Sequence, residues 1–157
     1  MGSNLCMPSI EDVAFLNSRC NELGMDTISL GGVLGFAIEA YEKGVITKDD
    51  LSGNNIGWGK PKEIAILIEE IAHRKNKVAD ILAEGVKVAA EKLGKNSESF
   101  AVHVNGLEIP GYDPRGTFGM GLAYATSDRG ACHQRAWTVK AELNNPELER
   151  FSFENKA

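Results

Sequence analysis

The stretch from Ile28 to Ala37 carries no charged side chain on any side. A helix over these residues would have no polar face, so it must be surrounded by other parts of the protein. Within it Gly31, Gly32 and Gly35 each cost about 0.5–1 kcal/mol relative to alanine in a helix interior. Close approach of a neighbouring helix, or of a ligand, would offset that cost. The sequence therefore predicts a fold built around one fully buried helix.

Apolar residues at intervals of three and four predict further helices around this one. Ser9 to Asp12 has the pattern of a capping box, and Thr47 to Asp50 repeats it before a single turn. Pro61 suits the first position of a helix. The predicted helices span residues 9–23, 28–44, 61–74, 78–93, 117–126 and 135–143.

A short β-hairpin is expected near residues 100–110. Phe100 to Val104 has the composition of a strand, and Asn105-Gly106 is a turn signal. The predicted fold class is therefore all-α in the main, a multi-helix bundle with one short hairpin. We expect residues 1–157 to form a single helical segment. Residues 1–95 and 96–157 are candidate subdomains, because the helical spacing of apolar residues gives way to strand and loop patterns between them.

Composition excludes several classes of function. The chain has 157 residues, 43% hydrophobic and 25% charged, which is ordinary for a globular protein. The net charge of −5 and the lack of a Lys/Arg block argue against a nucleic-acid partner. The longest apolar region, residues 28–40, is too short and too polar to span a membrane. The three cysteines lack the spacing of a disulfide framework or a metal site, so we assign no metal ligand and expect a reducing, cytoplasmic setting.

No self-contained catalytic motif is present, and the chemistry-bearing candidate is a histidine. His133 lies in a polar stretch, residues 128–135, within a region rich in glycine. An imidazole there suits a general acid or base, although the residues alone favour a structural role. Cys132 is adjacent to it, but adjacent residues seldom aim their side chains at each other, so a Cys/His nucleophile is not favoured.

Seven stretches, in their order and spacing, resemble one family. They are residues 20–29, 35–44, 57–59, 82–86, 103–110, 112–116 and 127–133. Together they resemble the tungsten-pterin aldehyde ferredoxin oxidoreductases, over nearly the whole chain. The resemblance is to an internal helical segment of the family's C-terminal domains.

The resemblance implies oxidation of aldehydes to carboxylic acids, with electrons passed to ferredoxin. It implies tungsten, or molybdenum, between two pterins, with a 4Fe–4S cluster nearby. The family holds each pterin partly with an Asp-x-x-Gly-Leu-(Asp/Cys) motif, which resembles Asn21 to Asp26 here. Asp26 and Gly24 match the motif, whereas Asn21 replaces its opening aspartate and Met25 replaces its leucine. A carboxylate suits the contact because it accepts hydrogen bonds from pterin N–H donors.

Three further residues gain expected roles from the resemblance. His133 matches the histidine that the family places near the metal, where it would hydrogen-bond a metal ligand or move a proton. Arg129 and Arg115 would reach pterin phosphates or a substrate carboxylate, or would simply fix their loops.

The family's cluster cysteines and its second pterin motif have no counterpart in this sequence. We therefore expect a segment of a longer enzyme, with the remaining domains as partners, no cofactor bound to this segment and no activity of its own. Two alternatives stay open: a non-catalytic helical interaction module, and a small-ligand binder using the glycine-rich helix and the His133 loop.

Overall fold

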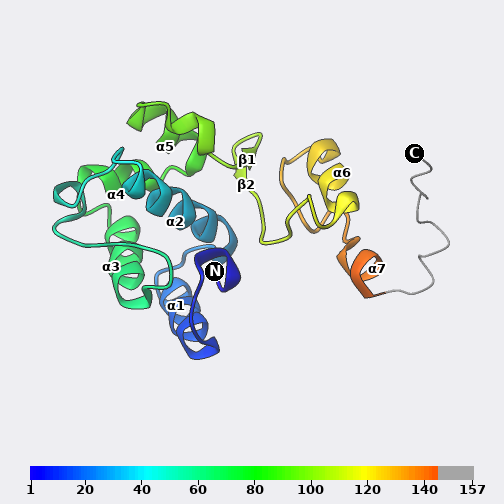
Figure 1. Cartoon of the computed structure of the whole chain (residues 1–157), viewed down its shortest axis with the longest axis horizontal. Coiled ribbons are helices and arrows are strands. Elements are labelled where there is room, and N and C mark those ends of the chain that lie inside the picture. The colour runs from blue at the N-terminus through cyan, green and yellow to red at the C-terminus, as the bar shows by residue number, and fades with distance from the viewer. Residues whose placement is uncertain (145–157) are drawn as a thin grey trace.

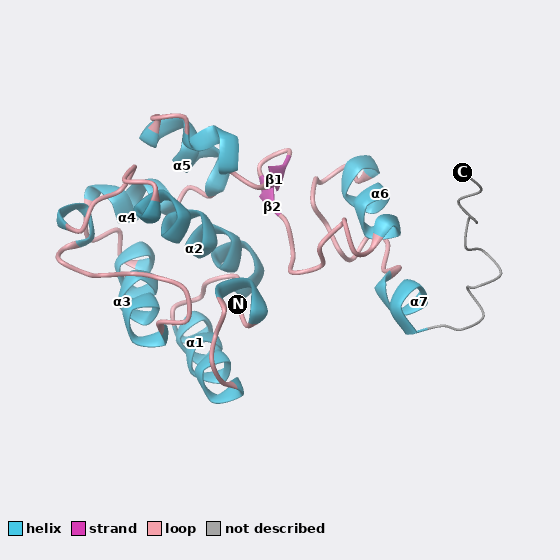
Figure 2. Ribbon diagram, viewed as in Figure 1, coloured by secondary structure: helices cyan, strands magenta, loops and turns pink. Residues whose placement is uncertain are grey.

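The computed structural model describes residues 1–144, with side chains described to Leu143. Figure 1 shows a larger helical part, a hairpin, and a smaller part that carries α6 and α7. In chain order the elements are η1 (Ser3–Leu5), α1 (Ile10–Glu22), α2 (Thr27–Glu42), η2 (Asp49–Leu51), α3 (Pro61–Ala72), α4 (Lys77–Leu82), α5 (Val86–Leu93), η3 (Ser97–Phe100), β1 (His103–Val104), β2 (Leu107–Glu108), α6 (Phe118–Thr126) and α7 (Val139–Asn144). The prediction of a mainly helical fold with one short hairpin is confirmed (Figure 2).

Helix α2 runs through the middle of the larger part, as its uncharged sequence predicts (Figure 1). It contacts η1, α1, α5, η3 and β2. Leu34, Ala37 and Ile38 are fully buried along it. Its glycines do permit a close approach: a Cβ added at Gly32 would lie 2.7 Å from the Cβ of Glu108. The close neighbour is therefore the hairpin, where the sequence suggested a helix or a ligand.

Local capping signals are confirmed. The Ser9 hydroxyl accepts from the Asp12 N–H at 3.1 Å and begins α1. The Asp26 carboxylate accepts from the Ser29 N–H at 2.8 Å and begins α2. In the second capping box the Thr47 N–H donates to Asp50 at 2.9 Å, ahead of the single turn η2. Each cap satisfies a backbone donor that the helix itself cannot.

The single helix predicted over residues 78–93 is wrong. The chain forms α4 and α5 with a break between them, where Gly85 has a φ of +87°. The Val86 N–H, the first of α5, donates to Glu108 Oε1 at 2.7 Å. A buried carboxylate from another element thus caps a new helix and interrupts the amphipathic pattern.

The hairpin pairs β1 with β2 in antiparallel register, His103 opposite Glu108 and Val104 opposite Leu107. Asn105 and Gly106 both have positive φ, as the predicted turn requires. Strand β1 is shorter than the predicted strand over 100–104, because Phe100 belongs to the 3-10 turn η3.

Beyond the hairpin a second cluster of buried side chains comprises Met120, Tyr124 and Ala131. Helix α6 confirms the prediction over 117–126, whereas α7 begins at Val139 rather than at Arg135. Ahead of α7, the His133 and Trp137 rings pack against the Tyr112 ring. These ring contacts replace the helical turn that was predicted there. The sequence after Asn144 lies outside the described residues, and the division at residue 95 stays a prediction.

Among residues 1–144 no single helix is long and apolar enough to cross a membrane. Helices α1 and α2 would meet that length and composition only as a pair, across a bend of 112°.

Candidate functional site

The turn between α1 and α2 holds three of the predicted cofactor-binding residues. Asn21 is exposed in the last turn of α1, and its carbonyl oxygen accepts from the Gly24 N–H at 3.2 Å. Gly24 has a φ of +68°, and a Cβ there would meet nothing within 4 Å. Asp26 is exposed and uses Oδ2 to cap α2. The turn therefore offers an open backbone and a carboxylate whose Oδ1 has no hydrogen-bond partner among the described residues.

Asp26 also lines a small cavity of about 110 Å³ beneath the start of α2. Ser29, Gly85 and Glu108 are also in its wall, together with apolar residues of α2, α3 and α4. Glu108 is only 4% exposed. The cavity is smaller than the roughly 300–1,000 Å³ typical of ligand pockets, so it suits the edge of a ligand rather than a whole one.

His133 lies in the smaller part, within a group of three rings. Its ring centroid is 6.1 Å from that of Tyr112 and 6.4 Å from that of Trp137. The Tyr112 and Trp137 centroids are 6.0 Å apart. His133 is half-buried, so the imidazole is held by neighbouring rings and still reachable. Aromatic contacts of this kind fix a ring without consuming its nitrogen atoms.

The residues next to His133 differ in exposure. Cys132 is buried, and hydrogen bonds from the backbone of Gln134 and Arg135 lower the pKa of its thiol. Arg129 is exposed, and its backbone N–H donates to the Ser127 hydroxyl at 3.3 Å. The Arg129 side chain makes no ion pair within the described residues.

The structure does not bring all the predicted site residues together. Asn21, Gly24 and Asp26 share one turn of the larger part, whereas Arg129 and His133 share one loop of the smaller part. Figure 1 shows the hairpin lying between the two parts. The small cavity that Asp26 lines does not have His133 in its wall. The Asp26 turn and the His133 loop are therefore separate groups, joined through the elements between them.

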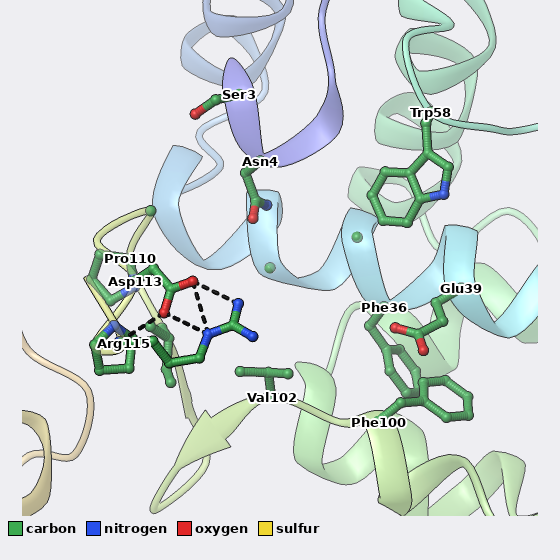
Figure 3. A pocket seen from close by; sticks show the side chains of 15 residues that line it. Ser3, Asn4, Phe36, Glu39, Trp58, Phe100, Val102, Pro110, Asp113 and Arg115 are labelled. Atoms are coloured by element: carbon green, nitrogen blue, oxygen red, sulfur yellow. Dashed lines mark hydrogen bonds and ion pairs between the residues drawn. The ribbon is translucent and has the colours of Figure 1, made fainter. Parts of the chain in front are cut away.

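A larger pocket of about 560 Å³ was not foreseen from the sequence. Figure 3 shows Phe36, Phe100 and Trp58 on one side and the Asp113–Arg115 pair on the other. The pocket draws on residues from Ser3 to Arg115, so no local motif could have indicated it. Four of the stretches that resemble the family contribute residues to its wall: 35–44, 57–59, 103–110 and 112–116. Its volume falls in the range of ordinary small-molecule sites.

An ion pair forms one rim of this pocket. Arg115 Nη2 lies 2.6 Å from Asp113 Oδ2, and Arg115 Nε lies 3.0 Å from Oδ1. Hydrogen bonds from this guanidinium lower the pKa of Asp113 to about 2. Arg115 therefore pairs within its own loop, and its expected roles stay predictions.

The described residues contain no group of three or more His, Cys, Asp or Glu side chains that could hold a metal ion. Cys6 is exposed at the end of η1, Cys20 is buried in α1, and Cys132 is buried beside His133. Three cysteines on separate elements do not form a cluster cage.

Comparison with known proteins decides the family. A family model described as aldehyde ferredoxin oxidoreductase, domains 2 and 3, matches residues 1–157. A tungsten-containing aldehyde ferredoxin oxidoreductase from Thermococcus kodakarensis is 42% identical over 144 residues, covering 91% of this chain and 23% of that protein. The chain belongs to this family. The protein of the same name from Pyrococcus furiosus is 41% identical over 144 residues, again 91% of this chain and 23% of that one.

Two further matches carry other names. The WOR-like subunit of an aliphatic sulfonate oxidoreductase from Pyrococcus furiosus is 34% identical over 154 residues, 94% of this chain and 24% of that one. The solved active site complex of benzoyl coenzyme A reductase, bound to 1,5-dienoyl-CoA, is similar at 30% identity with a TM-score of 0.50. That likeness covers 55% of this chain and 13% of the other. The chain spans about a quarter of the length of the curated relatives it matches.

Proposed function

We propose that this chain contributes one wall of the active site of an enzyme that oxidises aldehydes to carboxylic acids. The observation that carries the proposal is identity of about 40% to aldehyde-oxidising relatives over nine-tenths of the chain. Because the chain spans about a quarter of those relatives, the complete activity belongs to a longer polypeptide. Ferredoxin as the electron acceptor and a 4Fe–4S cluster supplied from outside residues 1–144 are parts of the same proposal.

The turn at Asp26 fits the edge of a pterin. Asp26 Oδ1 is an acceptor for an N–H donor, and the turn at Gly24 admits a flat ring because nothing lies within 4 Å of a Cβ added there. Asn21 adds a neutral amide where the family has a carboxylate, so it both donates and accepts. Tungsten would be bound by the pterin sulfur atoms, and the described residues offer no competing metal site. When bound, this group would supply the two-electron chemistry.

His133 is the residue proposed to handle the proton. Aldehyde oxidation to an acid releases protons as the carbonyl carbon gains an oxygen, so a base near neutral pKa is needed. An imidazole nitrogen of His133 would take that proton, while contacts with the Tyr112 and Trp137 rings hold its plane. Arg129, exposed four residues earlier, would attract the carboxylate product or a pterin phosphate.

The test uses the longest polypeptide that contains residues 1–157. Purified protein should contain tungsten or molybdenum, together with iron, and should reduce ferredoxin with an aldehyde. His133→Ala should lower kcat by about 10²–10⁴-fold with metal content unchanged, the usual contribution of acid–base catalysis. Absence of all three metals from protein grown with them would contradict the enzyme proposal.

The same protein separates the alternatives. Turnover of an aliphatic sulfonate but of no aldehyde would assign the chemistry named for the Pyrococcus furiosus subunit instead. Binding of a partner protein or a small ligand by metal-free protein, without turnover, would favour the interaction module or the ligand binder.

A further inference from the structure

The hairpin β1–β2 is in close contact with both parts of the molecule. Its paired residues alternate in direction, so Glu108 and Leu107 leave opposite faces. Strand β2 contacts α2 and α5 in the larger part. On the other side Val104 and Ile109 pack on the cluster around Met120. The hairpin is therefore the element through which the two halves of the proposed site are related.

Glu108 fixes the hairpin to the larger part by several contacts at once. Its Oε1 accepts the Val86 N–H at 2.7 Å, and the side chain is 4% exposed. A Cβ at Gly85 would lie 2.9 Å from this Oε1 atom, and a Cβ at Gly32 would lie 2.7 Å from the Glu108 Cβ. Gly32 and Gly85, which lack a Cβ, thus leave room for the Glu108 side chain. Glu108 also lines the small cavity that Asp26 lines, which connects it to the turn between α1 and α2.

Gly130 fixes the hairpin to the smaller part, three residues before His133. A Cβ at Gly130 would overlap the Val104 carbonyl oxygen and would lie 3.3 Å from the Leu107 Cβ. Gly130 is buried and has a φ of +94°. The loop that carries His133 therefore rests directly on the hairpin backbone. Close packing of this kind transmits position because neither surface can yield.

We propose that Glu108 is a positioning residue, which holds the hairpin against α2 and α5 and so sets the separation of Asp26 from His133. The role in catalysis rests on the proposed function above, but the geometric claim does not. Glu108 touches neither His133 nor any reacting atom, and it acts through the hairpin and Gly130. Misplacement of a reacting group by about 1 Å can cost on the order of 10²-fold in rate.

The separation is measured on residues 1–157 by pulsed electron spin resonance. Spin labels go on Ile66→Cys in α3 and Leu122→Cys in α6, both exposed, with Cys6→Ser removing the exposed native thiol. The parent should give one narrow distance distribution. Glu108→Ala and Gly130→Ala should each broaden or displace it. Glu108→Gln should restore the parent distribution, because the amide oxygen still accepts the Val86 N–H.

The matched control is Gly94→Ala. Gly94 has a φ of +63° but nothing within 4 Å of its added Cβ, so it carries the backbone strain without the clash. Its distance distribution should equal that of the parent. If Glu108→Ala does not fold, Gly130→Ala decides. An unchanged distribution in folded Glu108→Ala or Gly130→Ala, or equal broadening in Gly94→Ala, would overturn the proposal.

Activity of the longer polypeptide provides the second readout. Glu108→Ala should lower kcat about 10- to 100-fold with KM and tungsten content unchanged, and Glu108→Gln should recover most of it. Unchanged kcat in Glu108→Ala would overturn the catalytic part of the proposal. If the parent does not oxidise aldehydes while the distance changes persist, the proposed function fails and the positioning role of Glu108 stands.

Discussion

The Tyr124 hydroxyl donates a hydrogen bond to the Tyr112 carbonyl oxygen at 3.2 Å. This bond connects α6 to the segment that carries the Tyr112 ring, and that ring packs against His133. Tyr124 is also one of three buried residues in the second core cluster. The position of His133 therefore depends on a small core in which one phenol both packs and donates.

Burial raises the pKa of Tyr124 to about 12. The neutral phenol is favoured in the folded state, so its contribution to stability is complete below pH 10 and is lost as the pH rises toward about 12. Tyr124→Phe should remove this alkaline dependence and cost about 0.5–1.5 kcal/mol at neutral pH for the missing hydrogen bond. Ultraviolet absorbance titration and urea unfolding measure the two effects.

Tyr41→Phe is the control for that substitution, because Tyr41 makes its hydrogen bond to Asn55 in the larger part. It should leave the transition near pH 12 in place. Loss of the transition in Tyr41→Phe, or its survival in Tyr124→Phe, would show that the ionising phenol is not Tyr124.

The pocket rim yields a second prediction. Arg115 holds the pKa of Asp113 at about 2, against an ordinary 3.8. Asp113 therefore stabilises the fold fully above about pH 3.8, and this contribution is lost as the pH falls through about 2. Arg115→Gln should move the carboxyl titration midpoint back toward 3.8 when followed by carbon-13 NMR. Arg129→Gln, which removes an exposed arginine from a different loop, should leave the midpoint unchanged; a shift there would implicate net charge instead.

What could be predicted from the sequence was local. The caps at Ser9 and Thr47 need only residues three positions apart, so their patterns indicated helical starts that the structure confirms. The uncharged residues of α2 indicated burial because that pattern, too, lies within one short stretch of sequence. The break at Gly85 depends on Glu108, a residue 22 positions away in the chain, and the apolar spacing on either side continues as if the helix were unbroken. A single sequence does not contain that contact.

The candidate site divides in the same way. Asp26 was identified by a motif of six residues, and His133 by a loop match. The larger pocket was missed because Asn4, Phe36, Trp58 and Arg115 meet only after folding. Glu108 lies within a stretch that resembles the family, but nothing in the neighbouring sequence distinguishes a buried carboxylate from a solvated one.

Adjacent positions on α3 test which face supports the core. Leu67 is fully buried and Ile66 is 51% exposed. Leu67→Ala should destabilise the chain by about 2–5 kcal/mol through lost burial and a cavity. Ile66→Ala should change the free energy of unfolding by no more than about 0.5 kcal/mol, as expected for a surface position. Equal losses in urea unfolding would mean that α3 packs in another orientation.

Two glycines of α2 should respond in opposite directions to the same substitution. A Cβ at Gly35 meets its nearest neighbour at 3.7 Å, an ordinary contact, so Gly35→Ala should stabilise the chain by about 0.5–1 kcal/mol through helix propensity. A Cβ at Gly32 would lie 2.7 Å from the Glu108 Cβ, so in Gly32→Ala an overpacking cost of about 1–3 kcal/mol should exceed that gain. Urea unfolding of both variants measures the difference. Stabilisation by Gly32→Ala would mean that the hairpin can move away from α2 at no cost, because only propensity would then remain.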